Sequence, residues 1–303
     1  MKLKTLLVVF RANFLLLSVV LGFLGGSLAW YEHRKYGSDF NLAYAILAGI
    51  GLIITHISVN VFNDYFDSRN KLDYKTPRTP FSGGSKAITD GLITEKQALW
   101  LAIGTLTLVV PIGIFFILVK GWLLLPLLVV AALIIVLYTP IILRMGYPEW
   151  TAGLGLGTLP ILGLYFVQTG EYTITAAIAA VPSGILVHNL LLLNEFPDVE
   201  ADKTVKRHTL PIVTGKKIAA IVFSFLTVFT YLWIIGAVST GYMPSFTLLG
   251  LLTLPLGFKT ISGSFKFDDM GKLIPAMANN VLVVLLTQLL MGVGFILAGV
   301  FCR

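Results

Sequence analysis

Long runs of apolar residues alternate with short polar segments along the whole chain. A bilayer core about 30 Å thick needs about 20 apolar residues per helix, and nine stretches are long enough. They cover residues 7–31, 41–62, 97–118, 121–140, 150–169, 173–195, 217–239, 243–261 and 276–300. Their apolar positions do not alternate every second residue, as the strands of a membrane barrel do. The pattern predicts an all-α polytopic membrane protein: a single domain over residues 1–303, with nine transmembrane helices around a central, lipid-accessible cavity.

Two long polar connections interrupt this pattern, at about 68–96 and 196–216. Both carry dense charges of both signs, and we expect them to cap the cavity. The chain begins with "MKLKTLL", which is similar to the start of a secretory signal peptide. However, Arg11 interrupts the apolar run, and the run continues past the usual length of about 7–15 residues. We therefore expect an uncleaved first span.

Composition supports the membrane class, and charge predicts the orientation. Hydrophobic residues make up 56% of the chain and charged residues 12%, which is about half the charge of a typical soluble protein. Nine spans place the termini on opposite sides, and all but four of the 22 Lys and Arg residues fall on the amino-terminal side. The positive-inside rule then predicts a multi-pass cell-membrane protein with a cytoplasmic amino terminus, cytoplasmic caps and an outside carboxyl terminus. The net charge of +7 follows partly from this bias, and no fold signal for nucleic-acid binding accompanies it.

The second and sixth apolar runs end in similar polar sequences, "NVFND" and "NEFPD". An even number of spans separates the copies, so both run in the same direction across the membrane. Residues at i, i+4 and i+7 or i+8 share one helix face, which predicts two polar stripes at the cytoplasmic ends of two helices. If these helices face each other, four carboxylates and two amides converge on the cavity. The stripes comprise Asn60, Asp64 and Asp67 in the first copy and Asn194, Asp198 and Asp202 in the second.

Crowded carboxylates repel one another and are costly to remove from water, so they require a cation. Mg²⁺ takes oxygen ligands and commonly bridges carboxylates to substrate phosphates, whereas no His or Cys cluster indicates zinc. We therefore expect all six stripe residues to bind Mg²⁺, with the four aspartates catalytic. Basic residues downstream of each stripe are suited to a diphosphate; they are Lys75, Arg78, Lys206 and Arg207. A diphosphate substrate in an apolar helical container indicates an isoprenyl diphosphate.

Four more polar residues near the first stripe are candidate substrate ligands. Asn63 and Asp73 flank the stripe, and His56 extends it by one turn. His56 either contacts the acceptor or is a packed polar residue of the bundle. Arg11 is either an interfacial anchor or a diphosphate ligand. In contrast, "GLGLG" at 153–157 indicates close helix packing rather than a dinucleotide loop, because no strand precedes it.

These motifs resemble those of the UbiA superfamily of intramembrane prenyltransferases. The superfamily's first motif is N-D-x-x-D with a further Asp, and its second is D-x-x-x-D. The matching residues are Asn63, Asp64, Asp67 and Asp73 in the first motif and Asp198 and Asp202 in the second. In the commoner ubiquinone-type pattern the last Asp comes two positions earlier, where this chain has Lys71. The spacing here, with "SGGSKAITDGL" following, is more similar to the menaquinone branch.

The resemblance implies Mg²⁺-dependent transfer of a prenyl group from an isoprenyl diphosphate to an aromatic acceptor, a quinone precursor such as dihydroxynaphthoate. It also implies that Tyr138 and Tyr147, beside the loop between spans four and five, are candidates for substrate binding. Without the resemblance they would be read as interfacial tyrosines, which are common at membrane interfaces. No obligate protein partner is expected. Two alternatives stay open. One is geranylgeranyl transfer to a glyceryl phosphate in archaeal ether-lipid synthesis. The other is a secondary transporter, whose site would usually lie near the bilayer midplane.

Overall fold

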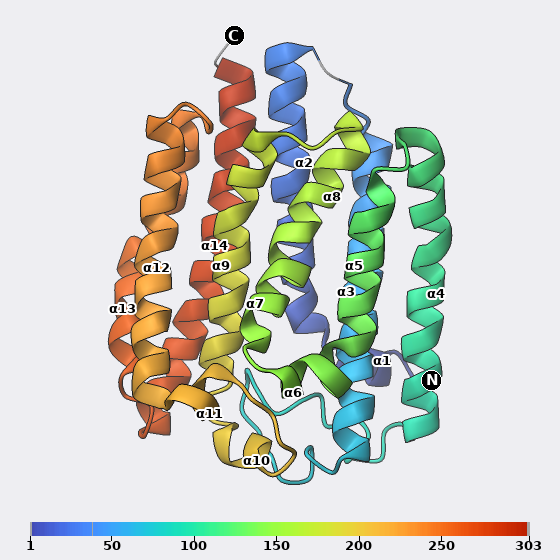
Figure 1. Ribbon diagram of the computed structural model, residues 1–303, viewed down its shortest axis with the longest axis vertical. Coiled ribbons are helices and arrows are strands. Elements are labelled where there is room, and N and C mark those ends of the chain that lie inside the picture. The colour runs from blue at the N-terminus through green and yellow to red at the C-terminus, as the bar shows by residue number, and fades with distance from the viewer. Residues whose placement is uncertain (1, 38, 302–303) are drawn as a thin grey trace.

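The computed structural model of the protein describes residues 2–37 and 39–301. In this part of the chain nine helices are long and apolar enough to cross a membrane, and there is no strand. The helices run side by side as one bundle (Figure 1), so the predicted all-α fold is confirmed. Arg303, at the predicted outside terminus, lies beyond the described residues. The spans are Ala12–Tyr36, Leu42–Arg69, Glu95–Lys120, Leu124–Met145, Pro148–Thr169, Ile174–Asn194, Lys216–Ser239, Ser245–Ser264 and Met270–Phe301.

Five spans are single helices, and the other four are built from shorter pieces. The single helices are α3 (Leu42–Arg69), α4 (Glu95–Lys120), α9 (Ile174–Asn194), α12 (Lys216–Ser239) and α14 (Met270–Phe301). The pieces are η1 (Ala12–Leu15), α2 (Leu16–Tyr36), α5 (Leu124–Leu137), η2 (Tyr138–Ile142), α6 (Leu143–Met145), α7 (Pro148–Gly153), η3 (Leu154–Thr158), α8 (Leu159–Thr169), η4 (Ser245–Thr253) and α13 (Leu254–Ser264). Here η2 and η3 are π-helical turns, which often mark functional sites.

The first apolar run is not one helix, so the predicted boundary at residue 7 is wrong. A short helix, α1 (Leu3–Val9), precedes Arg11, whose φ of 51° is left-handed. A left-handed residue cannot continue a right-handed helix. The span therefore begins at Ala12. The turn at Arg11 directs its side chain toward α3, where it meets Asp64.

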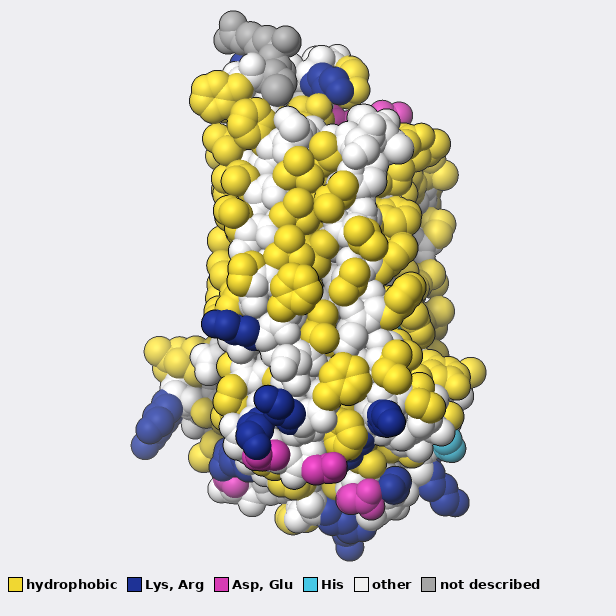
Figure 2. Space-filling model, turned by 90° about the vertical axis from the view of Figure 1, so that its left-hand side faces the viewer, with side chains coloured by type: hydrophobic (Ala, Val, Ile, Leu, Met, Phe, Trp, Pro, Cys, Tyr) yellow, Lys and Arg dark blue, Asp and Glu magenta, His cyan; other side chains and the backbone are white. Residues whose placement is uncertain are grey.

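The outer surface of the bundle is apolar over most of its length. In Figure 2 hydrophobic side chains cover the middle of the visible face, and most charged side chains gather at its lower end. Large apolar side chains point outward, among them Leu118, Leu133 and Phe225. An apolar belt of this size indicates contact with lipid. The protein is a multi-pass membrane protein.

Small residues let the helices around the cavity approach closely. A Cβ added at Gly157 of η3 would lie 2.5 Å from the carbonyl oxygen of Ser183 on α9, and one at Gly153 would lie 2.5 Å from that of Gly184. Only glycine permits this backbone contact. The packing interpretation of 153–157 is therefore confirmed.

Both long polar connections lie at the end of the bundle where α1 lies (Figure 1). The first joins α3 to α4 and contains no helix in its described residues 70–94, whereas the second contains α10 (Val199–Lys203) and α11 (Leu210–Thr214). The connections touch each other, because Lys75 Nζ donates to Thr204 Oγ1 at 3.3 Å. They form the predicted caps over this end.

Candidate active site

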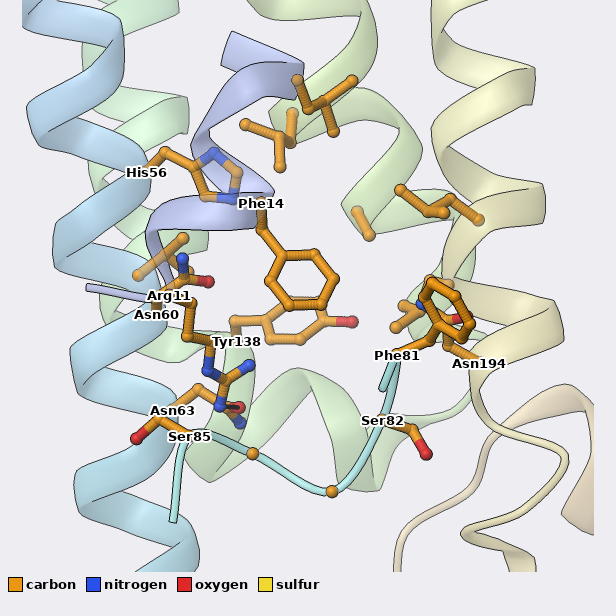
Figure 3. Close-up of a pocket in the computed structure, with 18 of the residues that line it drawn as sticks. Arg11, Phe14, His56, Asn60, Asn63, Phe81, Ser82, Ser85, Tyr138 and Asn194 are labelled. Carbon is orange, nitrogen blue, oxygen red and sulfur yellow. Dashed lines mark hydrogen bonds between the residues drawn. The ribbon is translucent and has the colours of Figure 1, made fainter. Parts of the chain in front are cut away.

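A cavity of about 860 Å³ lies beneath the two caps. Its walls come from the amino-terminal segment, α3, η2, η3, α9, α14 and both caps. The deeper walls are apolar and include Leu52, Leu156 and Leu285, whereas polar residues line the end near the caps. Figure 3 shows several of these side chains pointing into the pocket, with the cap segment of Ser82 and Ser85 below them. The cavity thus combines a polar mouth with an apolar interior.

The first acidic motif is held at the end of α3 by neighbouring polar groups. Asp64 is 3% exposed and forms an ion pair with Arg11. Asn63 accepts a hydrogen bond of 3.0 Å from Arg11 and donates one of 3.0 Å to Asp67. Asn60 donates to the carbonyl oxygen of Phe10 at 3.4 Å. Arg11 therefore supplies the positive charge nearest to Asp64.

The second motif does not continue as one helical stripe, contrary to the prediction. α9 ends at Asn194, and Asp198 precedes the separate helix α10. Pro197 stands between them, and proline disfavours helical geometry in the residue before it. Asp198 accepts a 3.2 Å hydrogen bond from the Ser82 hydroxyl, and Asp202 lies within α10. The turn changes the spacing of the motif but keeps both acids at the cavity.

Arg207 joins the two motifs. Its guanidinium forms ion pairs with Asp67 on α3 and with Asp202 Oδ1, the latter at 3.0 Å. All three side chains are mostly buried and line the cavity. Acids that four membrane spans separate in the sequence therefore share one cation.

The acids at the cap end are short of positive charge. Burial raises the pKa of Asp198 to about 7, and Asp202 raises it further. Burial likewise raises the pKa of Asp73 to about 7, with Asp67 and Asp64 contributing. For Asp202, burial outweighs the opposing effect of Arg207 and raises the pKa to about 6. Such shifts cluster at functional sites, and an additional cation here would favour the ionised carboxylates.

The oxygen donors fit Mg²⁺ by type, because carboxylates and amide oxygens line the mouth and the Oδ1 of Asn194 is buried without a partner. Within residues 2–37 and 39–301, however, no three His, Cys, Asp or Glu side chains stand together as a metal site. Arg11 and Arg207 hold Asp64, Asp67 and Asp202 in this arrangement. Joint metal binding therefore requires these arginines to shift.

A strap from Phe81 to Ser85 crosses the mouth between the motifs, which sequence reasoning missed. Ser82 donates to Asp198 in the second motif, and the backbone N–H of Ser85 donates to Asp64 in the first at 3.3 Å. Between them, a Cβ at Gly84 would lie 2.8 Å from Asp73 Oδ1. In the sequence, the only signal for this strap is the similarity of "SGGS" to the menaquinone branch.

Residues 19–282 match the UbiA prenyltransferase family. This range covers most of the chain. The chain belongs to the UbiA prenyltransferase family. It is an intramembrane enzyme that transfers prenyl groups, and the transporter alternative is set aside.

Three relatives of this UbiA family member show the similarity in sequence and in fold. It is 26% identical over 245 residues to a 1,4-dihydroxy-2-naphthoate octaprenyltransferase from Bacillus subtilis (strain 168), covering 80% of this chain and 78% of the relative. Its fold is similar to that of a digeranylgeranylglyceryl phosphate synthase, with 19% identity, a TM-score of 0.65 and coverage of 97% and 99% of the two chains. A UbiA homologue from Archaeoglobus fulgidus bound to GPP and Mg²⁺ has 14% identity, a TM-score of 0.63 and coverage of 96% and 99%.

The structure brings most of the predicted site residues of this UbiA protein to the cavity. Its lining includes Arg11, His56, Asn60, Asn63, Asp67, Asp73, Arg78, Tyr138, Asn194, Asp198, Asp202 and Arg207. Asp64 lies just behind the lining, buried against Arg11 and Ser85. His56 is buried and its Nδ1 lies 2.8 Å from the Ser18 hydroxyl, while Arg78 pairs with Asp90 at 3.3 Å on an exposed surface.

Three predicted residues are not brought to the cavity of this UbiA protein. Lys75, Lys206 and Tyr147 are exposed and do not line it. Lys75 extends to Thr204 in the other cap, so its ammonium forms a hydrogen bond between the two caps. Tyr147 is 48% exposed, as expected for an interfacial tyrosine.

Proposed function

We propose that this protein transfers a prenyl group from an isoprenyl diphosphate to an aromatic acceptor of the 1,4-dihydroxy-2-naphthoate type, with Mg²⁺ as cofactor. The carrying observation is that Arg207 pairs with Asp67 and Asp202 at the polar mouth of an apolar cavity. Acids of both motifs thus reach a single cation, and so can hold Mg²⁺ around a single diphosphate. The Bacillus subtilis relative supports the acceptor, and the Archaeoglobus fulgidus complex supports the donor and the metal.

Each part of the cavity has a task in this proposal. Asp64, Asp67, Asp198 and Asp202 would hold Mg²⁺, which supplies positive charge to the leaving diphosphate when bound. Arg207 turns from its two acids toward the diphosphate oxygens, which a guanidinium binds in bidentate fashion.

The apolar and aromatic walls serve the organic part of the reaction. The leucine-lined interior encloses the prenyl chain and keeps water from the allylic carbon, whose cation-like character would otherwise lead to hydrolysis. Phe14 and Tyr138 point into the pocket above the strap, and Phe81, the first residue of the strap, lies at its edge near Asn194 (Figure 3). Aromatic rings stack on other rings at offset or edge-on angles, so this level suits a flat acceptor close to the diphosphate.

A direct assay tests the reaction. Purified protein in lipid nanodiscs is incubated with labelled geranyl, geranylgeranyl or octaprenyl diphosphate, with 1,4-dihydroxy-2-naphthoate, and with Mg²⁺ or EDTA. We expect prenylated naphthoate with Mg²⁺ and none with EDTA. Failure of every donor to react in the presence of Mg²⁺ would contradict the proposal.

A glyceryl phosphate is the second candidate acceptor, because a digeranylgeranylglyceryl phosphate synthase has a similar fold. The same assay with geranylgeranylglyceryl phosphate separates the two candidates. A product with this lipid alone would replace the naphthoate proposal.

The caps and the cavity mouth face the cytoplasm in this proposal, with the amino terminus inside, the carboxyl terminus outside and the whole chain acting as one domain without a protein partner. The positive-inside bias supports this orientation. Glu200 in the second cap is well exposed. A cysteine introduced by Glu200→Cys in a Cys302→Ser background therefore shows which side of the membrane this cap faces. A membrane-impermeant maleimide should label it only after cells are permeabilised; labelling of intact cells would invert the topology.

A further inference from the structure

Polar atoms without partners are concentrated on one wall of the cavity. Among the described residues, the buried oxygens without a hydrogen-bond partner include the hydroxyls of Tyr138 and Thr209 and both carboxyl oxygens of Glu195. All three residues line the cavity, and Glu195 is only 5% exposed. Buried polar groups in native proteins almost always have partners. Three unpaired ones on the same wall indicate a ligand that supplies the missing hydrogen bonds.

Glu149 connects the three residues behind the wall. Its Oε1 accepts the backbone N–H of Leu210, the residue after Thr209. Its carboxyl is within hydrogen-bond reach of Glu195, so a proton between the two carboxyls would pair one Glu195 oxygen and leave the other free. The Tyr138 hydroxyl lies within electrostatic range of Glu195 and Glu149. Glu149 is completely buried, which fixes the wall from behind. The wall is therefore built from η2, the end of α9 and the start of α11, and Glu149 contacts the last two from behind.

The carboxyl of Glu195 gives this wall a hydrogen-bond acceptor, and the hydroxyls of Tyr138 and Thr209 can donate or accept. Glu195 has two carboxyl oxygens, and Glu149, which lies beside it, can pair with at most one of them. At least one carboxyl oxygen of Glu195 is then available to accept a hydrogen bond. A neutral hydroxyl can donate to that oxygen and accept a hydrogen bond from Tyr138 or Thr209.

Aromatic rings face the pocket beside this wall. Tyr138 presents its ring as well as its hydroxyl to the pocket, Phe14 points into the same space, and Phe81 lies at its edge (Figure 3). In that view the Tyr138 hydroxyl points across the pocket toward the side of Asn194. A ligand that stacks against these rings and donates a hydrogen bond to the glutamate wall is a hydroxylated aromatic ring.

We propose that Tyr138, Glu195 and Thr209 form the subsite that binds a ring hydroxyl of the aromatic acceptor, with Glu195 accepting the hydrogen bond from it. This inference rests on the proposed function and specifies how the acceptor is selected. The subsite binds and orients the ring hydroxyl, so that the adjacent ring carbon faces the allylic carbon of the donor. It takes no part in holding the diphosphate.

Substitutions of Glu195 test the subsite through separate kinetics for acceptor and donor. Glu195→Leu should raise the KM for 1,4-dihydroxy-2-naphthoate about tenfold or more, the usual effect of removing a partner from a buried polar group. The KM for the isoprenyl diphosphate should not change. Glu195→Gln should have a smaller effect, because its carbonyl oxygen still accepts a hydrogen bond. Glu200→Leu and Glu200→Gln are matched controls, since Glu200 is exposed and pairs with Lys203.

Tyr138→Phe tests the opposite side of the subsite while preserving the ring. It should also raise the KM for the acceptor and leave that for the donor unchanged. Tyr172→Phe is the control, because that hydroxyl bonds to Leu123 near the other end of the bundle. An unchanged KM for the acceptor in both Glu195→Leu and Tyr138→Phe would overturn the inference. An equal rise in both KM values would do so too, because it would show a general disturbance of the cavity.

Binding of two naphthoates, measured anaerobically without donor, separates this inference from the proposed function. 2-Naphthoate has the ring and the carboxylate of 1,4-dihydroxy-2-naphthoate but lacks its hydroxyls. The wild-type protein should bind the dihydroxy compound about tenfold more tightly, and Glu195→Leu should abolish this preference. If the preference is found but no naphthoate is prenylated, the proposed function fails and the subsite stands. If naphthoate is prenylated but both compounds bind equally well, the subsite fails and the proposed function stands.

Discussion

Arg207 forms an ion pair with Asp67, a residue 140 positions earlier in the chain. The same guanidinium donates to Asp202 Oδ1 at 3.0 Å, so one arginine of the second cap binds an acid of each motif. The side chains of Asp67 and Asp202 are only 7% and 4% exposed. A buried ion network of this kind contributes little over an apolar replacement, but removal of one partner leaves uncompensated charges.

Arg207→Leu should therefore destabilise the protein strongly. Loss of one partner from a buried ion pair costs about 3–5 kcal/mol, and here two carboxylates lose theirs. Thermal unfolding in detergent without metal measures the effect. Lys203→Leu is the control, because its pair with Glu200 is exposed and pairs at the surface contribute about 0–1 kcal/mol. Similar changes in Tm for the two variants would show that Arg207 does not hold the motifs together.

Asp64→Asn and Asp198→Asn should each reduce prenyl transfer about 100-fold or more, because several kcal/mol of charge stabilisation at the diphosphate depend on the metal. The amides are nearly isosteric, but Asp64→Asn also removes the charge partner of Arg11, so thermal unfolding of both variants is measured alongside transfer. Asp269→Asn serves as control, since Asp269 pairs with Lys272 outside the cavity at 2.7 Å. Transfer at the wild-type rate in either cavity variant would remove that residue from the metal site.

The number and course of the spans could be predicted because the bilayer fixes the length of every helix. The local breaks could not. The backbone of Arg11 is left-handed, and its side chain is bound by Asp64 and Asn63, which are distant in sequence. The break after Asn194 had a local signal in Pro197, which the regular spacing of the acids concealed.

The site was predictable where it repeats and obscure where it depends on the path of the caps. The two acidic motifs stand out because the same residue types recur at two helix ends. Lys206 and Arg207 are adjacent basic residues, and only the path of the second cap decides that Arg207 enters the cavity while Lys206 is exposed. Glu195 was likewise hidden, because a single glutamate after an apolar run does not reveal that Glu149 lies behind it.

The acids at the mouth should make the stability of the metal-free protein fall as pH rises. Asp198 and Asp73 have pKa values of about 7, above the ordinary 3.8, mainly because they are buried. Between these values the folded state binds more protons than the unfolded state, so the free energy of unfolding decreases from about pH 4 to about pH 7. Mg²⁺ should reduce this slope, because it favours the ionised carboxylates.

Thermal unfolding from pH 5 to pH 8, in EDTA and in Mg²⁺, measures this slope. Asp198→Asn should show a weaker dependence on both pH and metal. Identical slopes with and without Mg²⁺ would show that these acids do not bind the metal.

Gly84→Ala should impair the strap beyond the ordinary cost of its backbone conformation. Gly84 has φ of +73°, and its new Cβ would lie 2.8 Å from Asp73 Oδ1 and 3.4 Å from Asp64 Oδ1. Left-handed geometry alone costs an alanine about 1–2 kcal/mol. Gly91→Ala isolates that cost, because Gly91 has φ of +69° and no atom within 4 Å of the new Cβ. We therefore expect both variants to lose stability, but only Gly84→Ala to weaken Mg²⁺-dependent prenyl transfer, since it alone displaces carboxylates of the first motif. Equal transfer activity in the two variants would show that the strap does not position these acids.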